Sequence, residues 1–496
     1  MGETQFRKSH PKGLYTLFAT EMWERFSYYG MRSLLVLYLT ATVVNGGFGL
    51  DRQAALEIYA IFTGLVYLTP ILGGWVSDNL LGQRKTVYVG GLVMAIGQFL
   101  LAAGAFMHGW DAELRAFVSY FGLGVLIVGN GFFKPNISTI VGEFYDDNDP
   151  MKDSAFNIFY LGINLGAILG TFIAGGLGEN VDWGWGFFTA GIGMVISVIW
   201  LNAKEKSLEN HGLPPNAPEG STKITAKDWK DIFIWVIGLV VGIVVLMKVW
   251  SFLPESVTTI ITYVGFAAII LGLAYVIGKG TNGINEWSRM GVIIVLAIFN
   301  VVFWAGFEQA GGTFSLFAKD NTDRVMFGWE MPATWFQNVN SLAILIGAPL
   351  FAGLWLWLDK KGWNPRTPIK FALGLAFATV AFWVMTQASN ASEGGNLVSP
   401  FWLVGVYVLL TIGELMLSPI GLSMITKLAP TKLVSVVMGL WMASFAAGNY
   451  LAGMLEGILH KYDFELYPFI MMLMLGSTIL LLLISPILNK AMKGIH

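Results

Sequence analysis

The chain contains no cysteine and few charged residues. Among its 496 residues, Asp, Glu, Lys and Arg make up 12%, against roughly 25% in an ordinary soluble domain. The lack of cysteine excludes disulfides, thiol nucleophiles and cysteine-ligated metals. The low charge, together with 55% hydrophobic residues and a mean hydropathy of +0.63, excludes a soluble globular domain. The composition therefore predicts a polytopic membrane protein.

Histidine is also scarce, and none of it falls within an apolar segment. The five histidines lie in predicted loops or at helix ends: His10, His108, His211, His460 and His496. An intramembrane hydrolase needs a nucleophile and a base within reach of each other, so we do not expect an enzyme. The longest polar stretch, about 203–228, is too short for a catalytic domain. Any chemistry is therefore expected among the helices.

Apolar segments long enough to cross about 30 Å of hydrocarbon occur fourteen times. They run approximately over 14–44, 53–77, 85–108, 113–140, 154–176, 184–202, 229–251, 257–278, 289–318, 333–357, 367–387, 399–428, 433–457 and 466–489. With the N-terminus inside, 21 of the 30 Lys and Arg fall on the inner side and six on the outer side. This bias predicts that both termini are cytoplasmic. No signal-peptide cleavage pattern follows the polar residues Met1 to Lys12, so we expect the first span to be retained.

Similar residues recur at an offset of 281 positions. Trp23 and Phe26 recur as Trp304 and Phe307, Asp78 as Asp359, and Lys85 as Arg366. Two similar six-helix halves are expected, with the substrate site between them near the bilayer midplane. The predicted order is an N-terminal segment 1–13, a bundle 14–202, a linker 203–228, an inserted helix pair 229–278, a bundle 289–489 and a tail 490–496. The sequence thus predicts an all-α membrane protein with fourteen transmembrane helices.

The first span carries four charges. At about 100° per residue, Glu21, Glu24, Arg25 and Arg32 share one helix face with Tyr28 and Tyr29. A charge at the bilayer centre costs at least about 2.5 to 3.5 kcal/mol, so this face must look into a bundle interior or a water-filled cavity. A structural ion pair between Glu21 and Arg25, four residues apart, is the alternative. That pair alone would leave Arg32 without a partner.

A third cation lies in the fourth span, where Lys134 precedes Pro135. Proline removes one helical hydrogen bond and kinks the helix, which predicts a moving part. Lys134 could instead extend toward the inner membrane surface. Otherwise Arg25, Arg32 and Lys134 form a cluster suited to a carboxylate or another anion.

The second half carries isolated carboxylates, Glu308 and Glu414. An ammonium group could pair with either, and burial would favour their protonated form. Cations in one half and carboxylates in the other suit a zwitterion whose charges are well separated, such as a short peptide. Asn164 and Asn340 could bind its backbone, although Asn164 suits a hydrogen bond between helices equally well. The expected apolar walls, for which helix packing or lipid contact is the alternative, are Tyr29, Tyr67, Tyr160, Trp304, Phe307 and Trp441.

Several motifs together resemble the proton-dependent oligopeptide transporters, the peptide transporter branch of the major facilitator superfamily. Gly74 to Lys85 is similar to the inner-loop motif of the superfamily. The matching family segments are Glu21 to Gly30, Phe132 to Asn136, Phe159 to Gly166, Glu414 to Gly421 and Met438 to Asn449. The resemblance covers nearly the whole chain, and bacterial members carry two inserted helices like those expected here.

The resemblance implies import of di- and tripeptides by alternating access, driven by inward proton flow, across the bacterial cytoplasmic membrane. It implies a monomer that needs no cofactor and binds no nucleic acid. Arg25, Arg32 and Lys134 would hold the peptide carboxylate, Glu414 its amino end, and Asn164 and Asn340 its backbone. Ser418 is a further expected substrate-binding residue. Proton coupling would fall to Glu21, Glu24, Arg25, Lys134 and Glu308.

The sequence departs from the family at two of these places. Asn340 is followed by Ser341 where proline is common, and Phe307 stands where some members have an acid. Three cations could also serve another anion, so a proton-coupled transporter of nitrate or of a peptide-like drug is the rival hypothesis. A receptor that binds peptide without moving it is a third.

Overall fold

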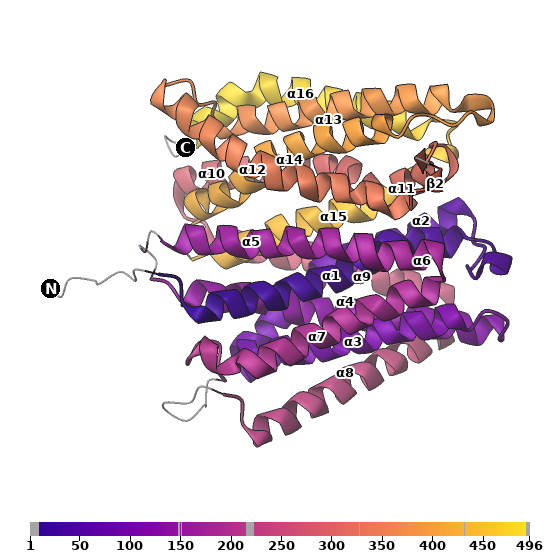
Figure 1. The fold of residues 1–496 in the computed structure, drawn as a ribbon. Coiled ribbons are helices and arrows are strands. Elements are labelled where there is room, and N and C mark those ends of the chain that lie inside the picture. Colours follow the sequence, from indigo (N-terminus) through magenta and orange to yellow (C-terminus); the bar gives the residue numbers. More distant parts are fainter. Residues whose placement is uncertain are drawn as a thin grey trace. The chain divides into compact units, whose positions relative to one another are not determined.

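The structure is a computed structural model that describes residues 9–146, 149, 151–214, 223–326, 328–430 and 432–492. The predicted N-terminal segment 1–13, linker 203–228 and tail 490–496 lie partly outside these residues. In the described part, the chain is built almost entirely of helices (Figure 1).

Fourteen long helical stretches follow one another along the described chain. They are α1 (Lys12–Thr40), α2 (Arg52–Val76) with η2 (Ser77–Leu81), α3 (Gln83–Phe106), α4 (Ala112–Glu143), α5 (Met151–Gly170) with η3 (Thr171–Gly175) and α6 (Gly176–Asn180), α7 (Trp183–Lys204), α8 (Ala226–Phe252), α9 (Glu255–Gly280), α10 (Gly283–Phe307) with η5 (Glu308–Gly311) and α11 (Thr313–Asp320), η6 (Ala333–Gln337) with α12 (Asn338–Lys360), α13 (Thr367–Ala391), α14 (Phe401–Leu428), α15 (Val434–His460) and α16 (Leu466–Ala491). Each contains most of one predicted span, so the prediction of fourteen helices is confirmed.

Twelve of these stretches are long and apolar enough to cross a membrane by length and composition, counting the described residues alone. The other two are α1, with its five charged residues, and α9. The short elements are η1 (Val43–Asn45), η4 (Glu205–Leu208), η7 (Glu393–Gly395) and a hairpin of β1 (Val325–Met326) and β2 (Trp329–Glu330). The first span is shorter than predicted, because α1 ends at Thr40 and the apolar residues after it form η1.

Aspartate caps begin three of the helices. Asp51, Asp111 and Asp182 directly precede α2, α4 and α7, and each carboxylate accepts a hydrogen bond from a backbone N–H of the first turn. Such a cap satisfies one of the amide donors that a helix start leaves open. Polar loop residues of the sequence thus fix where these spans start.

By contacts, the chain divides into two compact units. Unit 1 comprises Met1–Ala55, Leu65–Val245 and Met331–Ser341, and unit 2 comprises Leu56–Gly64, Leu246–Glu330 and Leu342–His496. The units interleave along the chain, since a stretch of α2 groups with unit 2 and the start of α12 with unit 1. Helix α8 belongs to unit 1 up to Val245, whereas α9 belongs to unit 2. The sequence halves 14–202 and 289–489 remain a prediction.

In unit 1, helix α1 packs against α5 and α7, and α3 packs against α4 and α7 (Figure 1). Gly166 and Gly170 of α5 face the backbone of α1, where an added Cβ would overlap the carbonyl groups of Met22 and Phe26. Small residues let membrane helices approach closely. The α5 surface therefore holds the charged helix α1 by backbone contact.

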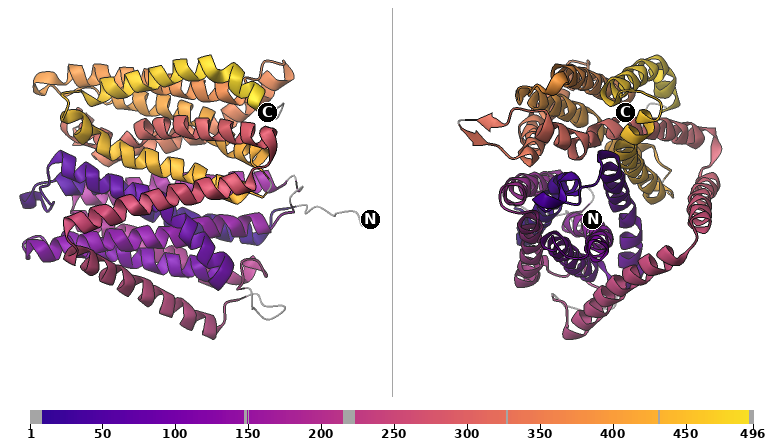
Figure 2. Two further views of the ribbon diagram at one scale, coloured as in Figure 1. Left: turned by 180° about the vertical axis from the view of Figure 1, so that it is seen from behind. Right: turned by 90° about the vertical axis from the view of Figure 1, so that its right-hand side faces the viewer.

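In unit 2, α13 packs against α14 and α16, and α10 packs against α15. Figure 2 shows α16 lying along α13. Gly374 of α13 and Gly413 of α14 meet at their backbones, since a Cβ at Gly374 would lie 2.9 Å from the Gly413 carbonyl oxygen. This close crossing fixes the position of α14 at Gly413, directly before Glu414.

Candidate functional site

Three charged side chains of α1 form a buried cluster. The Arg25 guanidinium donates to both carboxylate oxygens of Glu24, with Nη2 2.8 Å from Oε1, and its Nε lies 3.0 Å from Glu21 Oε1. Glu21, Glu24 and Arg25 are 2%, 0% and 3% exposed. The expected pair of Glu21 and Arg25 is therefore present, but Glu24 shares the same guanidinium.

Helix α4 completes the surroundings of this cluster. Asn130 is 1% exposed and donates its amide to Glu24 Oε1 at 3.2 Å. A buried carboxylate without donors would be costly, and the amide removes part of that cost. Sequence reasoning missed Asn130. Its signal was a polar residue within a span, one helical turn before Lys134.

Lys134 lies on α4 next to α2. Its ammonium group is 4.5 Å from the ring centroid of Tyr67, a cation–π contact, and its charge acts on both Glu21 and Glu24. Helix α4 continues through Pro135, and the Asn136 amide donates to the Phe132 carbonyl at 2.7 Å and to the Gly73 carbonyl of α2 at 3.4 Å. Asn136 thus links α2 and α4 at the proline.

Arg32 lies two turns beyond Arg25 on the same helix. It is 8% exposed, and its guanidinium carbon is 5.9 Å from the ring centroid of Tyr29. Seven residues of helix separate the two arginines by about 10 Å. The cations of α1 therefore form a row along the helix, with the two carboxylates at one end.

On α5, Asn164 is buried and its amide donates to the Tyr160 carbonyl of the same helix at 3.0 Å. Tyr160 is 40% exposed. In α12, Asn340 is half-buried and belongs to unit 1. The roles of these three residues as peptide ligands remain predictions.

In unit 2, Glu308 directly follows α10 and is 2% exposed. One helical turn earlier in the chain, Trp304 donates its indole N–H to Asn300 Oδ1 at 3.1 Å, and the Asn300 amide donates to Ser444 Oγ at 2.8 Å. Sequence reasoning missed Asn300 and Ser444. Their hydrogen bonds join α10 to α15, so the helix that ends at Glu308 is fixed by a buried polar chain.

Three of the predicted wall residues lie in one buried aromatic cluster. The Trp304 ring lies 4.9 Å from Phe307 and 4.8 Å from Phe445, and Phe445 lies 6.4 Å from Trp441. Trp304, Phe307 and Trp441 are 6%, 9% and 0% exposed. Helix packing, the alternative for these aromatics, therefore accounts for most of their surface.

Two predicted substrate-binding residues of unit 2 have a buried polar atom that lacks a hydrogen-bond partner among the described residues. These atoms are Ser418 Oγ on α14 and the indole N–H of Trp441 on α15. On α14, the half-buried Glu414 precedes Ser418 by one helical turn. The Trp441 ring of α15 packs against Gly421 of α14. A buried polar atom without a partner costs about 1 to 3 kcal/mol, so this part of α14 is prepared for a polar ligand or water.

The sequence profile of the POT family matches residues 84–472. The chain belongs to the POT family. The recognition from motifs is thereby confirmed, and with it the all-α major facilitator architecture of a multi-pass membrane protein.

Relatives match this POT family chain over almost its whole length. It is 36% identical to the peptide transporter YePEPT of Yersinia enterocolitica, over 98% of this chain and 96% of the relative. It is 32% identical to a di-/tripeptide transporter of Lactococcus lactis, over 97% and 96%.

Solved structures agree with this assignment. A peptide transporter POT in complex with sulfate matches with a TM-score of 0.81 at 36% identity, over 100% of this chain and 97% of that one. A POT family transporter in complex with 5-aminolevulinic acid matches with a TM-score of 0.81 at 29% identity, over 97% of each chain.

The inner-loop motif of this POT family chain anchors the linker. Arg84 is fully buried, and its guanidinium donates to the carbonyl groups of His211 and Glu209 at 2.6 and 2.7 Å. The backbone N–H of Arg84 donates to the Gly212 carbonyl. Lys85 forms ion pairs with Asp228 and Asp231 of α8. Arg84 and Lys85 therefore bind specific partners in the linker and in α8.

A second unexpected contact joins α6 to η6 within unit 1. The Glu179 carboxylate accepts hydrogen bonds from the backbone N–H groups of Ala333 and Thr334 at 2.9 and 2.8 Å. Beside it, the rings of Phe172 and Trp335 stack with their centroids 4.0 Å apart. The start of α12 is thus fastened to a helix of the first sequence half.

Proposed function

We propose that this POT family chain is a proton-coupled symporter that imports di- and tripeptides across the bacterial cytoplasmic membrane by alternating access. The observation that carries the proposal is the buried cluster of Glu21, Glu24 and Arg25 with Lys134 beside it. Charges are kept inside a membrane protein where they bind substrate or move protons. The relatives named above as peptide and di-/tripeptide transporters support the substrate class.

The peptide carboxylate binds the cations of the first half, Arg25, Arg32 and Lys134. Its amino group binds Glu414, and the unpartnered Ser418 hydroxyl and Trp441 indole N–H of unit 2 hydrogen-bond the peptide beside it. Asn164 and Asn340 bind the peptide backbone, and Tyr29, Tyr67 and Tyr160 contribute apolar surface. This division of charge matches a zwitterion.

Protons couple to this site through buried glutamates. Glu21 and Glu24 share Arg25, and Lys134 acts on both carboxylates. A proton on one carboxylate, or on the buried Glu308, weakens the hold on a cation, which then accepts the peptide carboxylate. The two halves rock about the loaded site, as in transporters built from repeats.

The proton gradient supplies enough free energy for this cycle. Each proton entering yields about 2.3 kcal/mol per 100 mV and about 1.4 kcal/mol per pH unit. A gradient of that size concentrates a neutral peptide several hundredfold. In this proposal the protein works as a monomer and needs no cofactor. Both termini lie in the cytoplasm, an orientation that the distribution of Lys and Arg favours.

Uptake of labelled dialanine into proteoliposomes with an imposed inward proton gradient and a negative interior tests the proposal. Accumulation that an uncoupler abolishes, and that unlabelled tripeptides compete away, is expected. A protein that is folded and inserted but accumulates no dialanine would overturn it.

A proton-coupled transporter of another anion, such as nitrate or a peptide-like drug, is the second candidate. Relatives in solved structures bind sulfate, 5-aminolevulinic acid or alafosfalin, so sites of this family accept anionic groups that are not peptides. Nitrate and alafosfalin are therefore the next ligands to test in the same vesicles.

A further inference from the structure

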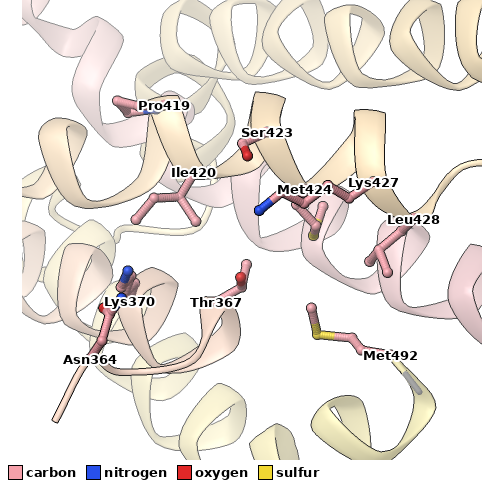
Figure 3. A pocket seen from close by; sticks show the side chains of 10 residues that line it. All are labelled: Asn364, Thr367, Lys370, Pro419, Ile420, Ser423, Met424, Lys427, Leu428 and Met492. Atoms are coloured by element: carbon pink, nitrogen blue, oxygen red, sulfur yellow. The ribbon is translucent and has the colours of Figure 1, made fainter. Parts of the chain in front are cut away.

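A polar cavity of about 260 Å³ opens at the start of α13, within unit 2. Thr367 and Lys370 line one side of it, and Ser423 and Lys427 of α14 line the other. Figure 3 shows the side chains of Lys427 and Ser423 directed from α14 toward the side of Thr367 and Lys370. Met492, directly after α16, closes one end.

The charge of this cavity is positive. Among the described residues that line it, two are lysines and none is acidic. The two ammonium groups repel each other, and the carboxylate of Asp359, in the last turn of α12, attracts that of Lys370. Asp359 also accepts a hydrogen bond from the Asn364 amide at 3.2 Å, while the buried Oδ1 of Asn364 has no partner among the described residues.

The first sequence half has its own cation at the start of the matching helix. Lys85 lies at the start of α3, the helix that the 281-residue offset relates to α13, and it is neutralised by Asp228 and Asp231 of α8. The offset matches Lys85 to Arg366, which directly precedes α13 and does not line the cavity, so Lys370 and Lys427 are additional cations of the second half.

The donors present suit a phosphate group. Two lysines and the hydroxyl-bearing residues Thr367 and Ser423 line the cavity from two helices, and the N-terminus of the 25-residue helix α13 adds partial positive charge. Thirteen residues of α14 separate Glu414 from Lys427, about 20 Å along the helix, so the end of the cavity that holds Lys427 is remote from the carboxylate of the peptide site. The distribution of Lys and Arg places it at the level of the inner headgroups.

We propose that this cavity binds the phosphate of a glycerophosphate group, supplied by an anionic phospholipid of the inner leaflet or by a soluble glycerol phosphate. Lys370 and Lys427 pair with the phosphate charge, and Thr367 and Ser423 donate to its oxygens. The site is distinct from the transport site and makes α13 and α14 sensitive to the anion content at the inner membrane surface.

Binding to the purified full chain in detergent tests this proposal with three probes. Dihexanoyl phosphatidylglycerol carries the anionic group on short acyl chains, dihexanoyl phosphatidylcholine carries no net charge, and glycerol 3-phosphate carries no chains. The anionic lipid is expected to bind more tightly than the zwitterionic one. The double variant Lys370→Gln/Lys427→Gln should weaken that binding about 30-fold and leave the zwitterionic lipid unaffected.

The variant Lys360→Gln/Lys361→Gln removes two nearby lysines that do not line the cavity, so it should bind like the wild type. Glycerol 3-phosphate that binds as tightly as the anionic lipid would identify a soluble source, and binding of the lipid alone would identify the membrane. Anionic lipid that binds equally to the wild type and to the Lys370/Lys427 double variant would overturn the proposal.

If the double variant does not fold, Ser423→Asp replaces it. Ser423 is exposed, so the fold tolerates the change, and the added carboxylate repels a phosphate. Unchanged binding of the anionic lipid to this variant would equally overturn the proposal.

Discussion

Lys85 of α3 pairs with two carboxylates of α8 at once, with its Nζ 2.6 Å from Asp228 Oδ1 and 3.0 Å from Asp231 Oδ2. One helical turn along α3, the Tyr88 ring lies 4.9 Å from the ring of Trp229. Helix α8 is thereby attached to the first bundle by a specific polar contact. This helix of the inserted pair is therefore more than an apolar addition to the bundle.

Loss of this attachment should destabilise the protein moderately. The Lys85 side chain is 8% exposed, whereas Asp228 and Asp231 are 18% and 38% exposed, so solvent screens part of the interaction. We expect Lys85→Ala to lower the free energy of unfolding by about 1 kcal/mol, measured by thermal unfolding in detergent.

The matched control is Lys230→Ala, which removes an exposed lysine of α8. The exchanged pair Lys85→Asp with Asp228→Lys should recover part of the loss. Equal stability of the Lys85 variant and the control would contradict the expectation.

Arg25→Lys should impair transport although it conserves charge. The guanidinium serves Glu21 and Glu24 together through a planar array of donors, and a lysine ammonium cannot reproduce that geometry. We expect initial dialanine uptake to fall at least about tenfold, on the scale of one charged hydrogen bond. Arg52→Lys, at the start of α2, is the control, and normal uptake by the Arg25 variant would exclude a role for the paired geometry.

The helices were predictable because each span must be long and apolar, and that requirement is visible in any window of the sequence. The end of α1 was missed because Val43 and Val44 prolong the apolar run after the helix has stopped. Hydropathy shows which residues favour an apolar environment, but it does not show where the backbone leaves the helical conformation.

The charged face of α1 was predictable in the same way, since helical periodicity alone aligns Glu21, Glu24 and Arg25. Their partners were not. A polar side chain within a span shows that it needs a partner, but the sequence does not say which, and the contact of Asn130 with Glu24 joins residues 106 positions apart. The contacts of Glu179 and Lys85 were missed for the same reason.

Glu179 should control access to the region around η6. Its carboxylate holds the N–H groups of Ala333 and Thr334, and Thr334 is fully buried. Because the chain has no cysteine, Thr334→Cys gives a single labelling site. Adding Glu179→Ala should raise the rate of labelling by a membrane-impermeant maleimide severalfold, because two amide donors lose their acceptor.

The control for this measurement is Glu330→Ala, which removes an exposed carboxylate from β2 that pairs with Arg324. It should leave the labelling rate unchanged. A Glu179→Ala protein that labels no faster than its Thr334→Cys parent would show that this contact does not limit access.

Glu308→Gln should separate exchange of peptide from accumulation of peptide. Glu308 is 2% exposed, and glutamine resembles its protonated form in size and charge. The variant can therefore bind peptide and rock between its two states, but this position no longer carries a proton through the cycle. Peptide-driven counterflow is expected to match the wild type, while accumulation under an imposed proton gradient is lost.

Glu393→Gln, in the exposed turn η7, should retain both activities and controls for the loss of a carboxylate. If Glu308→Gln still accumulates dialanine, the coupling proton travels through Glu21 and Glu24 without Glu308. If counterflow is lost as well, Glu308 takes part in peptide binding or in the rocking of the halves. Where counterflow is kept, lost accumulation assigns the coupling proton to Glu308 and retained accumulation assigns it to Glu21 and Glu24, because the two assays share every step except proton movement.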